Sequence, residues 1–384
     1  MIWEELTRQL ESLSEDNLLR QRKTLESACG THAVIGGKRV LAFCSNDYLG
    51  LASHPALREA ICESARLWGT GSGGSHVVNG HMGPHDALEK ALAGFVGAKR
   101  ALFYSTGYMA NIGVVPTLVG RGDAVFADRL NHASLIDAVQ LSRADHRRYA
   151  HNDMAQLEKM LSQSGARRKL ILTDAVFSMD GDLAPLKTLF SLAEQYDAWL
   201  VVDDAHGFGV LGQEGRGSLD YCGIPFHPRL VYIGTLGKAA GVSGAFVAGE
   251  DTVIEWLMQR SRSYIFTTAT SPVVASALLA SLELVRNGED RRRHLQELIA
   301  QLQDGLKDTR WKLLPSFTAI QPVIVGENEA VLKVSGELQR RGIWVPAIRP
   351  PTVPKGSARL RVSLSASHTG EQVAKLIDAL REMP

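Results

Sequence analysis

The chain has 384 residues, of which 45% are hydrophobic and 22% charged, an ordinary composition for a globular protein with ample core. A formal net charge of +1 argues against a broad electrostatic surface for nucleic acid or an anionic membrane. The four cysteines (Cys29, Cys44, Cys62 and Cys222) are scattered and form no CxxC pair, which argues against a disulfide framework or a zinc site and fits a reducing compartment.

The start of the chain, MIWEELTRQL, has early acids and no apolar core, so it does not have the pattern of a secretory signal. The longest uncharged run, 264–282, approaches the length of a membrane span but carries many threonines and serines. We therefore expect a cytoplasmic protein with no membrane partner.

Residues 3–28 have a helical pattern with Trp3, Leu6, Leu10 and Leu13 on one face, and predict an N-terminal arm that packs on the body or on a partner subunit. FCSNDYLGL at 43–51 predicts an extended segment and a turn. A helix is expected from Pro55 to Trp68, with proline in its first turn.

Strand-like and helix-like segments then alternate. Several strand candidates, such as LILT and WLVVD, are continuous apolar runs, as expected when helices cover both faces of a sheet. This alternation predicts βαβ units and a mostly parallel, three-layered α/β fold. The expected strands are 101–104, 124–127, 170–173, 199–203, 230–234 and 245–248, and the expected helices 109–119, 134–141, 153–162 and 185–196.

The pattern changes after Pro272, where two long helices (273–287 and 291–306) precede a strand at 319–326, a helix at 329–341, short strands near 343–348 and 360–364, and a last helix at 370–381. This order predicts a smaller α+β domain. We place the divisions at an arm of residues 1–45, a large domain of 46–280 and a small domain of 281–384.

Lys238 lies just past the strand of RLVYIGTLGKAAG, beside Gly237 and Ala239. Ligands bind at the carboxyl ends of strands in open α/β sheets, and a lysine there can form a Schiff base with a carbonyl cofactor. Asp203 ends the strand of VVDDAHG, and His206 follows it. An acid for a pyridine nitrogen and a lysine for the Schiff base are the two requirements of pyridoxal phosphate chemistry. A salt-bridged lysine and a capping aspartate are the structural alternatives.

Two GxGxxG matches are the rival signals, because this pattern marks dinucleotide binding when it lies between a strand and a helix. The match at Gly69 follows a helix-like segment, and the match at Gly207 precedes QEGRGSLDYCGIPFHP, which is too rich in glycine and proline for the required helix. Lys238 follows Gly237, but Tyr232 occupies the position of the first glycine of a P-loop. Both nucleotide interpretations are therefore disfavoured.

Three further segments follow expected strands. In STGYMAN an expected strand ends before Gly107, where a helix begins whose N–H groups suit a phosphate. DRLNHASL places His132 just after a strand, and VFSMDGD places Ser178 at the end of another. Each alone also fits a cap, a buried histidine or a turn. Five such residues at five strand ends favour one shared site; they are Gly107, His132, Ser178, Asp203 and Lys238.

The chain resembles the α-oxoamine synthases, a family of fold-type-I pyridoxal phosphate enzymes, over essentially its whole length. The resemblance rests on FCSNDYLGL, GTGSGGSH, DRLNHASL, VFSMDGDLAPL, VVDDAHGFGVLG, GTLGKAAG and AIRPPTVPKGSARLRVSLSASH. It departs from many relatives at His76, where they carry arginine after GSGGS, so no substrate contact is assigned there.

The resemblance implies a role for each matching residue. Lys238 would bind pyridoxal phosphate covalently and act as acid and base, Asp203 would pair with the pyridine nitrogen, and His206 with the phenolic oxygen. His132 would stack on the ring and contact substrate. Gly107, Tyr108, Ser178 and Thr235 would hold the cofactor, and Asn46, Arg361, Arg20 and Thr352 the substrates, with Arg20 and Arg22 both open for the same contact. No metal is expected.

The reaction implied is the decarboxylative condensation of an amino acid with an acyl thioester. The resemblance favours L-alanine and a pimeloyl thioester of CoA or a carrier protein over sister enzymes that use glycine and make 2-amino-3-ketobutyrate or 5-aminolevulinate. It also implies a homodimer with shared active sites, in which Thr267 and Thr268 reach the partner's phosphate. A nicotinamide oxidoreductase and a catalytically silent binding protein are the rivals from other classes.

Overall fold

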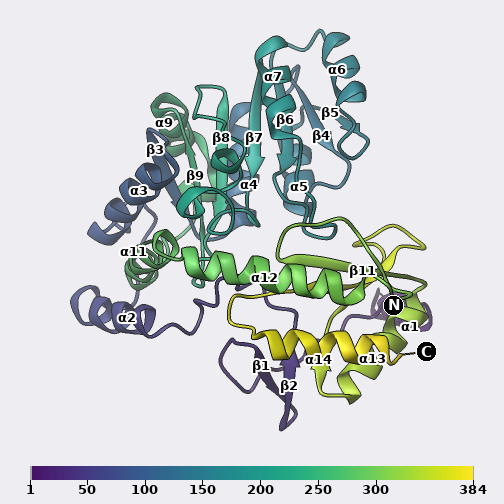
Figure 1. Cartoon of the computed structure of the whole chain (residues 1–384). Coiled ribbons are helices and arrows are strands. Elements are labelled where there is room, and N and C mark those ends of the chain that lie inside the picture. Colours follow the sequence, from purple (N-terminus) through teal and green to yellow (C-terminus); the bar gives the residue numbers. More distant parts are fainter. Residues whose placement is uncertain (1, 384) are drawn as a thin grey trace. The chain divides into compact units, whose positions relative to one another are not determined.

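A computed structural model describes residues 2–383, and the chain in it forms two compact units (Figure 1). The unit that we call the sheet unit comprises Leu49–Ser178 and Asp182–Arg292. The terminal unit comprises the N-terminal residues up to Tyr48, the short piece Met179–Gly181 and the residues from Arg293 onward. The division into an arm, a large and a small domain stays a prediction.

The sheet unit is built on a seven-stranded sheet in the order β3-β9-β8-β7-β6-β4-β5. Only β9 runs antiparallel to its neighbours, so the predicted mostly parallel sheet is confirmed. Its strands are β3 (Arg100–Tyr104), β4 (Ala124–Asp128), β5 (Asp145–Tyr149), β6 (Lys169–Asp174), β7 (Ala198–Asp203), β8 (Leu230–Thr235) and β9 (Ala245–Gly249).

Helices cover both faces of this sheet. One face packs on α4, α5 and α9, and α3, α6 and α7 contact its strands as well. The helices of the sheet unit are α2 (Pro55–Trp68), α3 (Gly83–Val96), α4 (Gly107–Leu118), α5 (Ala133–Ser142), α6 (Met154–Ser162), α7 (Leu186–Gln195), α8 (Ser218–Tyr221), α9 (Asp251–Arg260), α10 (Arg262–Ile265) and α11 (Pro272–Arg286), with a 3₁₀ turn at Gln213–Gly215.

The apolar strands are buried because every side chain meets a helix layer. In β6, Leu170 and Leu172 join the core cluster on the α4 and α5 face, whereas Ile171 between them points to the other face and is also fully buried. The three-layered α/β architecture expected from the continuous apolar runs follows from this double coverage.

The terminal unit has two small sheets, ordered β1-β2-β12 and β10-β11-β14-β13. Its strands are β1 (His32–Ile35), β2 (Lys38–Ala42), β10 (Lys312–Leu313), β11 (Ile320–Gly326), β12 (Ile343–Trp344), β13 (Ala347–Ile348) and β14 (Ala358–Ser363). Its helices are α1 (Ile2–Glu15), α13 (Asn328–Arg340) and α14 (Gly370–Arg381), and α12 (Glu289–Leu306) begins in the sheet unit and continues here.

The helix expected over residues 3–28 is wrong in its second half, because α1 ends at Glu15. Asn17 takes a left-handed conformation (φ 56°), and the N–H of Leu18 donates to the carbonyl of Leu13 at 2.7 Å. These are the features of a Schellman C-cap, which stops a helix by satisfying its last carbonyls. The elements that were not predicted from the sequence include the β1–β2 hairpin, β5, α3 and α9, and the short β10, α8 and α10.

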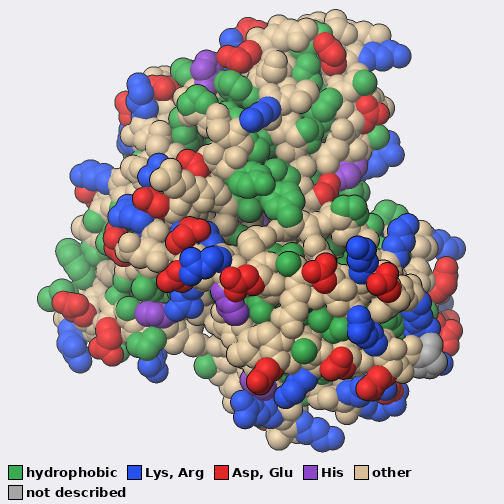
Figure 2. Space-filling model, viewed as in Figure 1, with side chains coloured by type: hydrophobic (Ala, Val, Ile, Leu, Met, Phe, Trp, Pro, Cys, Tyr) green, Lys and Arg blue, Asp and Glu red, His purple; other side chains and the backbone are tan. Residues whose placement is uncertain are grey.

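Charges of both signs are interspersed over the face of the molecule shown in Figure 2, in keeping with the net charge of +1. Within residues 2–383, no helix combines the length and the apolar character that crossing a bilayer requires.

Gly234 gives the first test of this packing. A Cβ at this position in β8 would lie 2.3 Å from Cε1 of the fully buried Phe246, so Gly234→Ala should overpack the core and cost about 1–3 kcal/mol. Gly94→Ala is the matched control, because a Cβ there meets nothing within 4 Å and alanine favours the helix α3 by roughly 0.5–1 kcal/mol. Thermal unfolding should show opposite shifts, and equal shifts would contradict this packing.

Candidate functional site

The predicted lysine and histidine lie together at the carboxyl ends of two neighbouring strands. Nζ of Lys238, in the turn after β8, is 2.9 Å from Nε2 of His206, in the turn after β7. His206 is buried and Lys238 half-buried. The turn holds the lysine in place, because the N–H of Gly241 donates to the Lys238 carbonyl at 2.8 Å.

The two consecutive aspartates at the end of β7 have different environments. Asp204 is fully buried and accepts hydrogen bonds from the N–H and Oγ of Ser218 at 2.6 and 2.5 Å and from the hydroxyl of Tyr232 at 2.8 Å. Burial raises the pKa of Asp204 to about 6 in spite of these donors. Asp204 therefore serves the local fold, which leaves Asp203 as the carboxylate for chemistry.

Asp203 is joined to His132 through two residues that the sequence reasoning did not assign. Nδ2 of Asn111 donates to Oδ2 of Asp203 at 2.7 Å and to Oγ of Ser134 at 2.8 Å. Oγ of Ser134 lies 2.7 Å from Nδ1 of His132. One signal could have found Asn111: it follows Gly107 by one helical turn, so both lie on the same face of α4.

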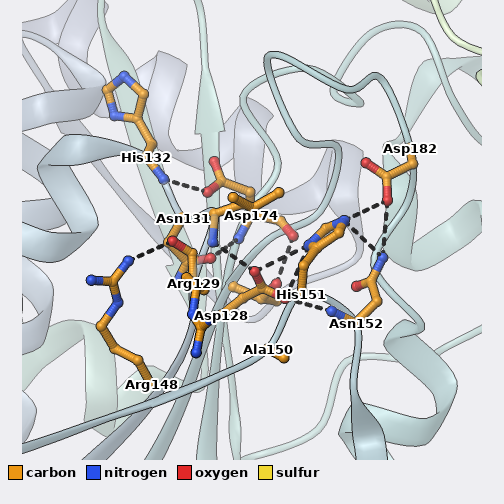
Figure 3. Close-up of polar contacts among 12 residues, drawn as sticks. Asp128, Arg129, Asn131, His132, Arg148, Ala150, His151, Asn152, Asp174 and Asp182 are labelled. Carbon is orange, nitrogen blue, oxygen red and sulfur yellow. Dashed lines mark hydrogen bonds and ion pairs between the residues drawn. The ribbon is translucent and has the colours of Figure 1, made fainter. Parts of the chain in front are cut away.

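Asp174 is a second carboxylate beside Asp203, which the sequence reasoning also missed. The parallel pairing of β6 and β7 places the two residues opposite each other. Oδ2 of Asp174 accepts the backbone N–H of His132 at 2.7 Å (Figure 3). Burial, and then the charge of Asp203, raise the pKa of Asp174 well above its usual range. Burial and the neighbouring charge thus favour the protonated form of Asp174.

The start of α4 forms a cradle beside Thr235 at the end of β8. A Cβ on Gly107 would lie 2.8 Å from Oγ1 of Thr235, so glycine leaves room for the threonine hydroxyl beside the helix start. Thr106 caps the helix by accepting the N–H of Met109 at 3.1 Å, and the first N–H groups of a helix have no partner within it. An anion is favoured at such a helix start.

Tyr108 and Ser178 have less defined positions in this cluster. The exposed hydroxyl of Tyr108 donates to the carboxylate of Asp137 in α5. Ser178 is half-buried and lies within a hairpin closed by the bridge between Val176 and Leu183. His132 begins α5 as its N-cap and keeps its ring exposed.

This donor set fits pyridoxal phosphate. The Asp203 carboxylate is an acceptor for a protonated ring nitrogen, Nζ of Lys238 is a nucleophile for an aldehyde, and the glycine cradle with Thr235 suits a phosphate. Oδ1 of Asn111 is buried without a hydrogen-bond partner among the described residues, so the region retains unused polar capacity.

The predicted substrate-binding residues other than His132 belong to the terminal unit. Nη1 of the buried Arg361 donates to Oδ1 of Asn46 at 3.0 Å and to Oγ of Ser363 at 2.8 Å, so the predicted pair Arg361 and Asn46 is brought together. Arg20 is exposed on the extended segment after α1, and Thr352 is exposed in a turn. The structure does not choose between Arg20 and Arg22, which is also exposed.

His76 lines a separate pocket of about 850 Å³ in the sheet unit, whose walls include none of the predicted site residues. Its ring stacks on Tyr264 with centroids 4.7 Å apart, and its Nδ1 lies 2.9 Å from Nδ1 of His81. His85 is adjacent, but its Nδ1 accepts the N–H of Met82 and its Nε2 donates to the carbonyl of Thr270. Both ring nitrogens of His85 are thus engaged by backbone groups.

Asp174 yields a pH-dependent prediction. Its native pKa is raised above the unfolded value of about 3.9, so folding retains a proton there and stability falls as the pH rises above that value. Asp174→Asn stays neutral and keeps an oxygen for the His132 N–H. The gain in melting temperature over the wild type should therefore be small at pH 4 and grow toward pH 8 in the cofactor-free protein. Asp304→Asn, an exposed control on α12, should show no such trend; a gain independent of pH would contradict the assignment.

Comparison with known proteins identifies the family. A family model described as "Aminotransferase class I and II" matches residues 38–380. An 8-amino-7-oxononanoate synthase of Herminiimonas arsenicoxydans is 64% identical over 99% of both chains, and one of Dechloromonas aromatica (strain RCB) is 58% identical over 100% of both.

Solved structures indicate the same family. A serine palmitoyltransferase of S. paucimobilis, solved with PLP and myriocin bound, superposes with a TM-score of 0.92 at 30% identity, covering 98% of this chain and 96% of that one. An 8-amino-7-oxononanoate synthase of Francisella tularensis gives 0.79 at 31% identity, covering 89% and 97%. The chain therefore belongs to the class I and II aminotransferases and, within them, to the α-oxoamine synthases.

Proposed function

We propose that the chain acts as an 8-amino-7-oxononanoate synthase, which condenses L-alanine with a pimeloyl thioester and releases CO2 and the free thiol carrier in biotin biosynthesis. The observation that carries this proposal is the placement of Lys238, His206 and Asp203 at adjacent strand ends in a chain 64% identical, over 99% of its length, to a relative with that name. The nicotinamide and binding-protein alternatives account neither for this arrangement of residues nor for the identity to that relative.

Pyridoxal phosphate is the cofactor, and bound at this site it supplies a cationic ring that withdraws electrons from the Cα of the amino acid. Lys238 would bind it covalently, Asp203 would keep the ring nitrogen protonated, and His206 would hydrogen-bond the phenolic oxygen. His132 would cover the ring face. The cofactor and its phosphate would be held by Gly107, Tyr108, Ser178 and Thr235.

Lys238 would also carry the proton transfers of the reaction. Its Nζ would remove the Cα proton of alanine and later return a proton to the product carbon. A free lysine, with a pKa of about 10.4, is a poor base at neutral pH. A cationic ring beside Nζ, together with partial burial, lowers the pKa of an amine and makes it a better base. His206, 2.9 Å from Nζ, would orient the amine.

The substrates would be held by residues of the terminal unit. Arg361 offers a guanidinium to the carboxylate of alanine, and its bonds to Asn46 and Ser363 fix the orientation of that group. Arg20, or Arg22 in its place, and Thr352 would contact the acyl thioester. The donor is either pimeloyl-CoA or a pimeloyl carrier protein.

We also propose a homodimer with shared active sites, in which Thr267 and Thr268 reach the partner's phosphate, and a cytoplasmic location. Support for the dimer comes from the family resemblance. Gel filtration with light scattering would test it, and a monomeric active enzyme would contradict it.

The proposed reaction is tested by measuring thiol release from several acyl-CoA esters with alanine, glycine and serine in turn. Turnover highest with alanine and pimeloyl-CoA, or only with a pimeloyl carrier protein, supports the proposal. Highest turnover with glycine and a short acyl-CoA would assign the chain to a sister acyltransferase.

Lys238→Ala should lack the visible absorbance of a cofactor bound covalently to the protein and lower turnover by roughly 10³-fold or more, because the covalent partner and the base are lost together. Lys90→Ala is the control, since Lys90 forms an exposed ion pair with Asp86 on α3 and is not one of the proposed site residues. Normal turnover by Lys238→Ala would rule out this assignment.

A further inference from the structure

His151 lies between two carboxylates at the edge of the candidate site (Figure 3). Its Nδ1 is 3.1 Å from Oδ1 of Asp128 and its Nε2 is 2.8 Å from Oδ2 of Asp182. The imidazole is half-buried, and Asp128 is 1% exposed. None of these residues was assigned a role from the sequence.

The three residues come from the loops after three neighbouring strands. Asp128 ends β4, His151 follows β5, and Asp182 lies in the hairpin after β6, and these strands are adjacent in the order β6-β4-β5. Nδ2 of Asn152 donates to Oδ2 of Asp182 at 3.0 Å as a second link. One side chain therefore connects three loops that the sheet hydrogen bonds do not join.

The Asp128 side of this connection leads to His132. The Asp128 carboxylate accepts the N–H of Leu130 at 2.8 Å and that of Asn152 at 2.9 Å, and its backbone carbonyl accepts the N–H of Asn131 at 3.2 Å. These bonds shape the turn that ends at His132, whose own N–H is fixed by Asp174. The position of His132 thus depends on Asp128.

The Asp182 side leads to Ser178. The backbone carbonyl of Asp182 accepts the N–H of Phe177 at 3.0 Å, which closes the hairpin that carries Ser178. The ring of Phe177 meets the His151 imidazole edge to face, with centroids 4.4 Å apart. His151 therefore contacts the residue next to Ser178 directly, and holds the base of its hairpin through Asp182.

His151 is suited to a permanent role in this network. Burial lowers its pKa, but hydrogen bonds and charges from Asp128 and Asp182 outweigh that effect and raise the pKa to about 10. Both ring nitrogens donate, so the side chain has no site left for proton exchange with a substrate. Loss of the imidazolium would leave Asp128 buried without its ionic partner.

We propose that His151 is a positioning residue that fixes His132 and Ser178 against the cofactor by tying the loops after β4, β5 and β6 through Asp128 and Asp182. This inference rests on the proposed site for pyridoxal phosphate and adds to it a support that lies outside the residues in contact with the cofactor.

The test compares His151→Gln with His146→Gln in the full chain. His146 is a half-buried histidine on β5 that bonds neither Asp128 nor Asp182. Cofactor affinity, measured by titrating the stripped protein and following absorbance, should weaken about tenfold or more in His151→Gln, the scale on which supporting partners of site ligands act. It should stay unchanged in His146→Gln. Equal affinity in the two variants would overturn the proposal.

A second comparison separates positioning from a merely structural role. In a His132→Ala background, His151→Gln should weaken the cofactor by a smaller factor than in the wild type, because part of its effect passes through His132. A purely structural histidine would lower the melting temperature while giving the same factor in both backgrounds, and that result would contradict the proposal.

Asp182→Asn covers the case in which His151→Gln does not fold. Asparagine keeps an acceptor for Nε2 of His151 but removes the charge, and Asp182 is partly exposed, so the fold should survive. Its cofactor affinity should fall severalfold, and an unchanged affinity would overturn the proposal. Because these readouts need no substrate, they remain valid if the alanine and pimeloyl reaction is refuted. A wild-type chain that binds no pyridoxal phosphate would instead refute the proposed function.

Discussion

The parallel register of β6, β7 and β8 is the constraint on which the candidate site depends. It brings the carboxyl ends of these strands to one edge, with Asp174 opposite Asp203 and the turn of Lys238 beyond β8. Two carboxylates in a buried position cannot both keep their charge without compensation. Hydrogen-bond donors surround both groups: Asn111 donates to Asp203, and the N–H of His132 donates to Asp174. The pKa of Asp174 is also raised, which favours its neutral form.

A second constraint is that the site residues lie on loops, and loops need support from outside the sheet. His132 and Ser178 follow β4 and β6, and among the described residues the pairing of these two strands ends before it reaches either side chain. Asp128, His151 and Asp182 supply such a link with a charged centre held on both sides. Charge and hydrogen bonding thus fix the loops relative to one another, as strand pairing fixes the strands within the sheet.

The fold does not by itself decide the substrate. A serine palmitoyltransferase shares this fold with a TM-score of 0.92 at 30% identity, although its name indicates a different amino acid and acyl group. We therefore expect that the choice of alanine and a pimeloyl thioester lies in side chains such as Arg361, Arg20 and Thr352 rather than in the sheet.

The sequence by itself determined the α/β class and most strands of the large sheet, and it predicted Lys238, Asp203 and His206 as one group. It could do so because buried parallel strands are continuous apolar runs, and because chemistry at a strand end leaves a polar residue next to such a run. The end of α1 at Glu15, β5 with its charged sequence DHRRY, and α3 were not predicted, since local caps and tertiary packing override the period of apolar residues there. Only the tertiary structure decided that Asp204 serves the fold, that Asn111 and Ser134 join Asp203 to His132, and that His151 lies between two carboxylates. The contacts of Asn111 and His151 join residues 23 to 92 positions apart, and no spacing along the chain encodes which strands become neighbours.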